Sequence, residues 1–389
     1  MLIALVISDG QPLQLENACY RQREYAKLRT VPGKIKNSGG VRSAPRKPHK
    51  PISQKELAER LGFSPATVSL VLNRSCAADS IPQETKDLIV AGARKFNYRP
   101  NFLARSLRTQ RSFTVGVIVP EISEGYTATV LSGIEDYLLQ EGYFYFVTSH
   151  RHHPDLIDEY PKMFLDRGVD GVIAVDTVWH HNLSVPVVTV SGHNQVPGVT
   201  NIVVNHEHAS HIALEHLVKL GHRKIVLIKG QDFSSDTEIR WKSNLDAAAR
   251  LGICVSAKLS VQLEEDSPSP QVGYNAMKKL MKNKKPFTAV FAFNDISAMG
   301  AMRALFEAGL RVPEDVSVVG FDDIQSAAYQ HPGLTTVRQP LRKMGKTAAE
   351  VVLRRVRNKS SKSEDRHIKE IVVEPELIVR ESTCKVRTS

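Results

Sequence analysis

Short apolar runs alternate with amphipathic stretches over most of the chain from residue 113 onward. The apolar runs have the length of buried strands and cover residues 113–119, 143–148, 171–175, 186–190, 224–228, 289–293 and 316–321. Between most of them apolar residues recur at helical spacing, as in residues 129–140, 206–220, 240–251, 271–281 and 296–308. Apolar strands joined by helical crossovers predict parallel sheets covered on both faces. These strands are too many for one small sheet, so the pattern predicts an α/β core of two doubly wound subdomains.

A shorter pattern precedes this core, at residues 53–73. Ser53 and Glu56 have the spacing of a capping box, which begins a helix. Gly62 supplies the left-handed residue that ends this helix, and Ser64 followed by Pro65 begins another. Two short capped helices joined by a tight turn are typical of a helix-turn-helix, whose second helix enters the major groove of DNA.

The apolar positions predict which faces of this small unit are buried. The second helix is expected to turn Val68, Val71 and Leu72 inward. The residues that then face outward are Pro65, Ala66, Ser69 and Leu70. A third helix is expected to start near Pro82 and to cover the first two with Leu88, Ile89, Ala93 and Phe96. The result is an all-α DNA-binding headpiece over residues 51–98. The segment at residues 101–108 is too short for a helix that is stable alone, so it should fold only against a partner.

The charge of the chain is concentrated at its front. Residues 1–111 carry 20 lysines and arginines and 8 acidic residues, whereas residues 112–389 carry 32 and 33. A basic module on a nearly neutral body fits phosphate binding by the headpiece. Residues 1–50 end in a stretch rich in Gly, Pro, Ser and basic residues, which predicts a disordered extension. A start codon placed too early and an extra contact to the DNA backbone are the alternatives for this extension.

Several classes of site are not supported by the sequence. The cysteines are scattered, which argues against a disulfide framework or a zinc site (Cys19, Cys76, Cys254 and Cys384). The histidine groups lack metal-ligand spacing, so neither a metal nor another cofactor is expected (His150, His152 and His153; His180 and His181; His206, His208 and His211). Since no apolar run reaches the ~18 residues of a membrane span, and residues 1–7 are too short for a secretory signal, a cytoplasmic location is expected.

These features resemble the lactose-repressor/galactose-repressor (LacI/GalR) family of bacterial transcription regulators. The resemblance covers roughly residues 52–383 and is carried by residues 57–73, 98–108, 216–225, 293–295, 318–323 and 334–340. It implies a hinge at residues 99–111 and a periplasmic-binding-protein-like core at residues 112–389. In this core the chain would cross three times between two doubly wound parallel-sheet subdomains. The subdomain nearer the DNA would comprise about 113–203 and 341–368, and the farther one about 205–337.

The resemblance also implies how DNA is read. A homodimer, or a tetramer as the larger alternative, would bind a pseudo-palindromic operator. The residues implied to face bases are Pro65, Ala66, Ser69 and Leu70, and those implied to face phosphate are Ser64, Thr67, Asn73 and Tyr98. Leu70 departs from the family's commoner arginine, and a leucine touches a thymine methyl but cannot pair with guanine. Packing of Leu70 within the headpiece is the alternative.

The hinge segment resembles the family helix that folds in the minor groove of the operator. Leu107 would be the wedge between base pairs, in a segment that also supplies Asn101, Ala104, Arg105 and Arg108. Ordinary solvated linker charges are the alternative for the arginines.

A small polar effector, most simply a sugar or sugar derivative, is implied in the core. Arg240, Asn294 and Asp322 match the family's effector-binding positions, and the weaker candidates are Glu121, Tyr126 and Asp176. Residues 121–127 lack the family's usual Asn-Pro-Phe, so this wall of the pocket departs from the pattern. Capping and packing roles are the alternative for these polar residues.

The leading hypothesis is therefore a sequence-specific transcriptional repressor and not an enzyme. One alternative is a transport-type sugar-binding protein, which would need an export signal and would lack the headpiece. The other is a doubly wound enzyme, but no GxGxxG, P-loop or GxSxG motif stands at a strand–helix turn.

Overall fold

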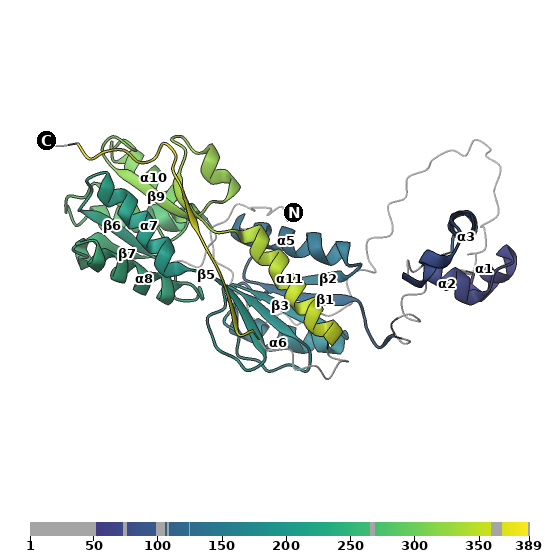
Figure 1. Ribbon diagram of the computed structural model, residues 1–389. Coiled ribbons are helices and arrows are strands. Elements are labelled where there is room, and N and C mark those ends of the chain that lie inside the picture. Colours follow the sequence, from purple (N-terminus) through teal and green to yellow (C-terminus); the bar gives the residue numbers. More distant parts are fainter. Residues whose placement is uncertain are drawn as a thin grey trace, which may run out of the picture. The chain divides into compact units, whose positions relative to one another are not determined.

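The computed structural model describes residues 52–72, 76–98, 106, 109–123, 125–264, 269–358 and 368–387 (Figure 1). The chain divides into two compact units, a headpiece up to residue 99 and a core from residue 100 onward. Each unit is described by itself.

The headpiece contains the predicted helix-turn-helix. Its helices are α1 (Gln54–Leu61), α2 (Pro65–Leu72) and α3 (Gln83–Lys95), with a 3-10 turn at Cys76–Ser80. The capping box that begins α1 is confirmed, because the Glu56 amide donates to Ser53 Oγ at 3.2 Å and the Ser53 amide donates to Glu56 Oε2 at 2.6 Å. Gly62 ends α1 at φ 72°, and Ser64 Oγ accepts from the Thr67 amide at 3.0 Å.

The headpiece core is small and tightly packed. Its buried side chains come from all three helices and are Leu57, Ala58, Val68, Val71, Ile89 and Ala93. Gly92 lets α3 approach α1, since a Cβ there would lie 2.5 Å from the Leu61 side chain. The expectation that Leu88 helps to cover α1 and α2 is wrong. Leu88 is 55% exposed, because the face of α3 that carries Ile89, Ala93 and Phe96 turns inward instead.

The core contains two six-stranded sheets, as expected of two doubly wound subdomains. The first subdomain has the strand order β11-β5-β4-β3-β1-β2, with β1 (Thr114–Val119), β2 (Phe144–Ser149), β3 (Gly171–Val175), β4 (Val187–Val190), β5 (Val199–Val204) and β11 (Glu370–Val373). The second has the order β12-β10-β9-β8-β6-β7, with β6 (Ile225–Lys229), β7 (Ser260–Gln262), β8 (Ala289–Phe291), β9 (Ser317–Asp322), β10 (Thr335–Arg338) and β12 (Glu376–Ile378). The described pairs are parallel except β10 with β12.

Helices cover both sheets. The first subdomain has α5 (Gly125–Gln140), α6 (Pro154–Asp166) and α11 (Leu341–Asn358), and the second has α7 (His206–Lys219), α8 (Thr237–Arg250), α9 (Gln271–Met281) and α10 (Asp295–Glu307). The chain passes between the two sheets three times, after β5, β10 and β11. Among the residues that the structure describes, no helix is long and apolar enough to cross a membrane.

Two glycines bring the backbones of α5 and α11 into close contact. A Cβ at Gly133 would lie 2.0 Å from the carbonyl oxygen of Arg342, and a Cβ at Gly345 would lie 2.0 Å from that of Val130. Neither position has room for a side chain. This contact fixes α5, whose first turn carries Tyr126.

Candidate effector-binding cleft

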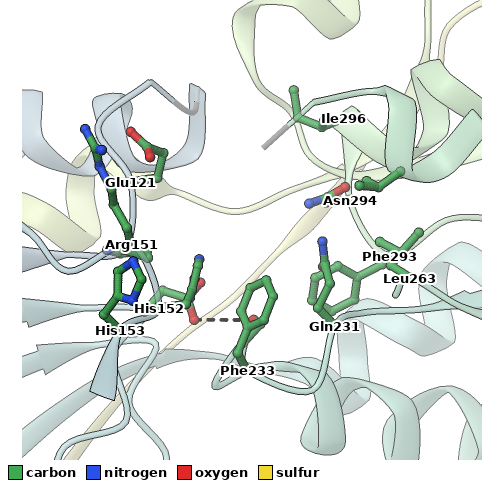
Figure 2. Close-up of a pocket in the computed structure, with 14 residues that line it drawn as sticks. Glu121, Arg151, His152, His153, Gln231, Phe233, Leu263, Phe293, Asn294 and Ile296 are labelled. Carbon is green, nitrogen blue, oxygen red and sulfur yellow. Dashed lines mark hydrogen bonds between the residues drawn. The ribbon is translucent and has the colours of Figure 1, made fainter. Parts of the chain in front are cut away.

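A cavity of about 260 Å³ lies between the two subdomains of the core (Figure 2). One wall comes from segments that follow β1, β2 and β3, and it includes Glu121, Arg151, His152, His153 and Asp176. The opposite wall follows β6 and β8 and includes Gln231, Phe233, Phe293, Asn294 and Ile296. Strands of both sheets therefore end at the cavity, which is where ligands bind in open parallel sheets.

The backbone is strained where several of these strands end. Asp176 follows β3 at φ 40°, Ser191 follows β4 at φ 56°, and Asp322 ends β9 at φ 111°. Positive φ is costly for residues other than glycine, and such residues cluster at ligand-binding sites. Of these three residues Asp176 lines the cavity, and so do Arg151 and His152, which follow β2 and also have positive φ.

Arg240 is buried next to the cavity. Its Nη1 donates to the carbonyl oxygen of Phe293 at 2.7 Å, and its Nη2 pairs with Asp236 Oδ2 at 2.6 Å. The guanidinium carbon lies 3.8 Å from the ring centroid of Phe321 and 4.5 Å from that of Phe293. Two aromatic faces and one carboxylate thus hold the Arg240 guanidinium in a single orientation.

Asp236 connects the two subdomains. His193, which follows β4, places Nε2 2.7 Å from Asp236 Oδ1, and His206 Nε2 lies 3.3 Å from the same oxygen. Burial alone would raise the pKa of Asp236, but His206 and Arg240 hold it well below its usual range. Burial lowers the pKa of His206. Asp236 is therefore a buried anion that the first subdomain contacts through His193.

The loop at residues 230–236, which we call the bridging loop, makes further contacts across the cleft. The Ser235 amide and hydroxyl donate to Asp176 Oδ1 at 3.1 and 2.7 Å, and the Ser234 hydroxyl donates to the same oxygen at 3.4 Å. The Phe233 and His152 rings lie 3.7 Å apart between centroids. Burial and the charge of Asp236 raise the pKa of Asp176. A carboxylate of one subdomain thus accepts hydroxyl hydrogens from the other.

Asp322 and Asn294 each have a structural partner. Asp322 accepts from Gln339 Nε2 at 2.7 Å, and burial raises the pKa of Asp322 to about 7 although Arg240 opposes the change. Asn294 caps α10, because its Oδ1 accepts from the Ser297 amide at 2.8 Å. The capping role that the sequence left open is confirmed for Asn294, yet its side chain also lines the cavity.

The cavity contains only part of the predicted set. Asn294, Asp176 and Glu121 line it, whereas Arg240, Asp322 and Tyr126 do not. The Tyr126 hydroxyl shares a 2.7 Å hydrogen bond with Ser191, and burial followed by the charges of Asp236 and Asp176 raises its pKa well above the usual value. Glu121 accepts from the adjacent Ile122 amide at 3.0 Å.

Sequence reasoning missed several residues of the cavity. Six polar and aromatic side chains that the predicted set lacks are Arg151, His152, His153, Gln231, Phe233 and Ser234. All of them closely follow β2 or β6, so applying the strand-end rule to those two predicted strands would have found them.

In the headpiece, the described residues implied to contact DNA lie along α2 and just beyond the end of α3. Ser64, Pro65 and Ala66 are exposed, whereas Thr67, Ser69, Leu70 and Tyr98 are partly buried. The remaining implied contacts lie outside the described residues (Asn73, Asn101, Ala104, Arg105, Leu107 and Arg108).

A helix-turn-helix unit followed by two parallel-sheet subdomains with a polar cleft between them defines a ligand-responsive DNA-binding regulator. Residues 214–383 match the family model described as a periplasmic binding protein-like domain. The HTH-type transcriptional repressor PurR of Aliivibrio fischeri (strain MJ11) is 30% identical over 336 residues, which cover 84% of this chain and 97% of that protein. The chain belongs to the LacI/GalR family of transcriptional repressors.

Solved structures agree with this assignment. The Lac repressor dimer bound to operator and the anti-inducer ONPF is 26% identical with a TM-score of 0.72, over 86% of this chain and 100% of that one. A complex of the transcriptional regulator CelR with cellobiose is 26% identical with a TM-score of 0.63, over 85% and 99%. The predicted family and fold are confirmed, and so is the prediction that the protein is a transcription regulator and not an enzyme.

Proposed function

We propose that this repressor binds a pseudo-palindromic operator as a homodimer in the cytoplasm and responds to a sugar or sugar derivative held in the cleft. Its segments would be the extension at residues 1–50, the headpiece at 51–98, the hinge at 99–111 and the effector core at 112–389. Effector binding would change the contacts between the two subdomains and, through the hinge, the affinity for the operator. Such coupling typically amounts to ~1–3 kcal/mol.

The contacts of Asp176 are the observation that supports a sugar as the effector. This carboxylate accepts hydrogen bonds from two serine hydroxyls of the bridging loop. Hydroxyl groups are the donors that a sugar offers, so effector hydroxyls could replace those of Ser234 and Ser235. The rings of Phe233 and Phe293 supply apolar faces in the same cavity, and the similar CelR structure holds cellobiose.

A ligand screen tests this proposal on the full chain. We expect a sugar to raise the unfolding temperature and to change operator binding, whereas nucleobases should do neither. Asp176→Ala should remove the sugar-induced shift, and Asp166→Ala, on the exposed side of α6, should retain it. Stabilisation by nucleobases alone, or an unchanged sugar response in Asp176→Ala, would contradict the proposed effector class.

The proposed homodimer is supported by an exposed aromatic pair on strand β2, at the edge of the first sheet. Phe144 and Phe146 are 59% and 39% exposed, and their rings meet edge to face at 5.5 Å. Exposed apolar patches and unpaired edge strands are typical of interaction surfaces. A second copy of the chain is the partner that a pseudo-palindromic operator requires.

Replacing both aromatics with aspartate should therefore produce monomers. We expect Phe144→Asp with Phe146→Asp to sediment as a monomer and to bind operator more weakly, because charges would be buried in the interface. Phe306→Asp, which alters an exposed aromatic residue of α10, is the matched control. If Phe306→Asp alone gives monomers, the dimer uses the second subdomain instead.

A further inference from the structure

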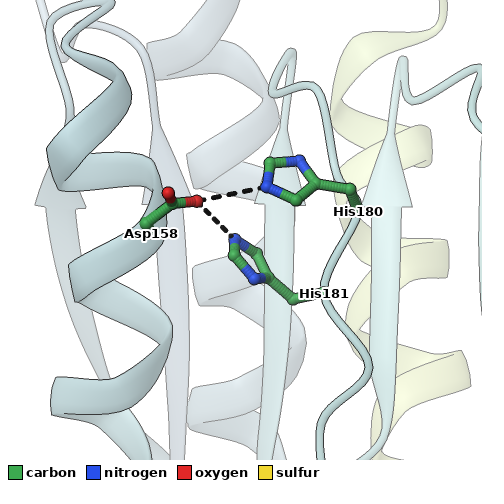
Figure 3. A group of neighbouring side chains, drawn as sticks. All are labelled: Asp158, His180 and His181. Atoms are coloured by element: carbon green, nitrogen blue, oxygen red, sulfur yellow. Dashed lines mark hydrogen bonds and ion pairs between the residues drawn. The ribbon is translucent and has the colours of Figure 1, made fainter.

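Two histidines and an aspartate converge on the surface of the first subdomain, outside the lining of the cleft (Figure 3). Asp158 lies on α6, and His180 and His181 lie in the segment between β3 and β4. The Nε2 atoms of the histidines are 3.1 and 3.2 Å from Asp158 Oδ1. One ligand atom from each residue lies within 4.8 Å of the others.

The chain holds the two imidazoles on the same side. Successive side chains of an extended chain point in opposite directions, yet the rings of His180 and His181 lie 4.3 Å apart and both direct a nitrogen toward Asp158 (Figure 3). The fully buried Trp179 anchors this segment, because its indole Nε1 donates to the His181 carbonyl at 2.9 Å. Asn194 Nδ2 in turn donates to the Trp179 carbonyl at 3.3 Å.

The Nε2 atom of His181 is buried and, within the described part of the chain, makes no hydrogen bond. It lies close to the carboxylate, but the geometry is not that of a hydrogen bond. A buried ring nitrogen that makes no hydrogen bond costs free energy that a bound metal ion would recover.

We propose that Asp158, His180 and His181 form a binding site for a divalent transition-metal ion, with zinc as the ion whose preferences fit best. Zinc binds imidazole nitrogen at about 2.0–2.1 Å and carboxylate oxygen at about 2.0–2.2 Å, which places tetrahedral ligand atoms about 3.3 Å apart. The distances from the two histidine Nε2 atoms to Asp158 Oδ1, 3.1 and 3.2 Å, are close to this value. The side chains of Asp158 and His180 are more than half exposed, so water can complete the coordination.

The chemistry of the donors supports a transition metal over magnesium or calcium. Imidazole suits zinc, copper and nickel, whereas magnesium and calcium prefer oxygen ligands throughout. The positions of these residues along the chain do not indicate a metal site, because Asp158 precedes His180 by 22 residues and lies on a different element. A bound ion would join α6 to the β3–β4 segment.

Calorimetric titration of the full chain with zinc chloride tests the site. We expect His180→Ala and Asp158→Asn each to weaken zinc affinity roughly 100-fold or more, because changes outside the ligand shell already cost 10–100-fold. Excess zinc should also raise the unfolding temperature of the unaltered chain but not that of either variant. Both altered side chains are largely exposed, so the variants should fold.

Two controls distinguish this site from other histidines. His331→Ala, an exposed histidine of the second subdomain, should bind zinc like the unaltered chain. His193→Ala tests the second histidine–aspartate cluster, which contains His193, His206 and Asp236. The proposal is overturned if the unaltered chain shows no saturable zinc binding. It is also overturned if His193→Ala loses zinc while His180→Ala and Asp158→Asn retain it.

Discussion

Replacing Arg240 with alanine is expected to lower the free energy of unfolding of the core by about 3–5 kcal/mol. Arg240 pairs with Asp236 at 2.6 Å, and both side chains are at least 95% buried. The substitution leaves the Asp236 anion buried with only His193 and His206 beside it. It also removes the cation from between the Phe293 and Phe321 rings. Urea unfolding followed by circular dichroism measures the loss.

A double variant separates charge from packing. Arg240→Met combined with Asp236→Asn removes both charges and keeps most of the volume, so it should recover much of the lost stability. If the double variant is as unstable as Arg240→Ala, the stability lost in Arg240→Ala comes from the aromatic stacking and not from the ion pair. Arg303→Ala breaks an exposed pair with Glu307 on α10 and should lower the free energy of unfolding far less than Arg240→Ala does.

Asp322→Asn is expected to make the core more stable at pH 8 than the unaltered chain. Burial raises the pKa of Asp322 in the folded chain to about 7, whereas an unfolded aspartate titrates near its ordinary value of 3.8. Between these two values the folded chain binds the proton more tightly, so this group's contribution to stability decreases as pH rises. Asparagine has no proton to lose, and its oxygen can still accept from Gln339.

The stability difference between Asp322→Asn and the unaltered chain should therefore grow between about pH 4 and pH 7 and level off above. Urea unfolding at several pH values measures it, with the exposed Asp166→Asn expected to follow the unaltered chain. Operator binding should persist in Asp322→Asn. Parallel pH curves for Asp322→Asn and the unaltered chain would show that Asp322 is not the acid whose pKa is raised by burial.

The strands that the sequence did not predict share a physical cause. β5, β7, β10, β11 and β12 are short or contain hydroxyl, amide or charged side chains, so they do not appear as apolar runs. Their polar groups are paired only in the folded core. Thr189 donates to Asn201 of β5 at 2.5 Å, and Thr336 of β10 donates to Asp295 at 2.5 Å. A pattern of apolar residues contains no information on such partners.

Only part of the candidate cleft could be predicted from the sequence. Asn294 and Asp322 follow or end strands that the sequence predicts, and the rule for parallel sheets brings strand ends together. The bridging loop could not be predicted, because its contacts join residues such as Ser235 and Asp176, which are 59 apart in the chain. Those contacts depend on how the two subdomains close on each other.

The sequence by itself determined the helix-turn-helix, the alternation of strands and helices in the core, and the family. Caps such as Ser53 with Glu56, and the spacing of Leu57, Val68 and Ile89, depend on interactions within a few residues, which the sequence displays directly. Only the tertiary structure decided which side chains meet across the cleft and that Asp158 meets His180 and His181. Those contacts form between distant segments, and their distances are set by the packing of whole elements.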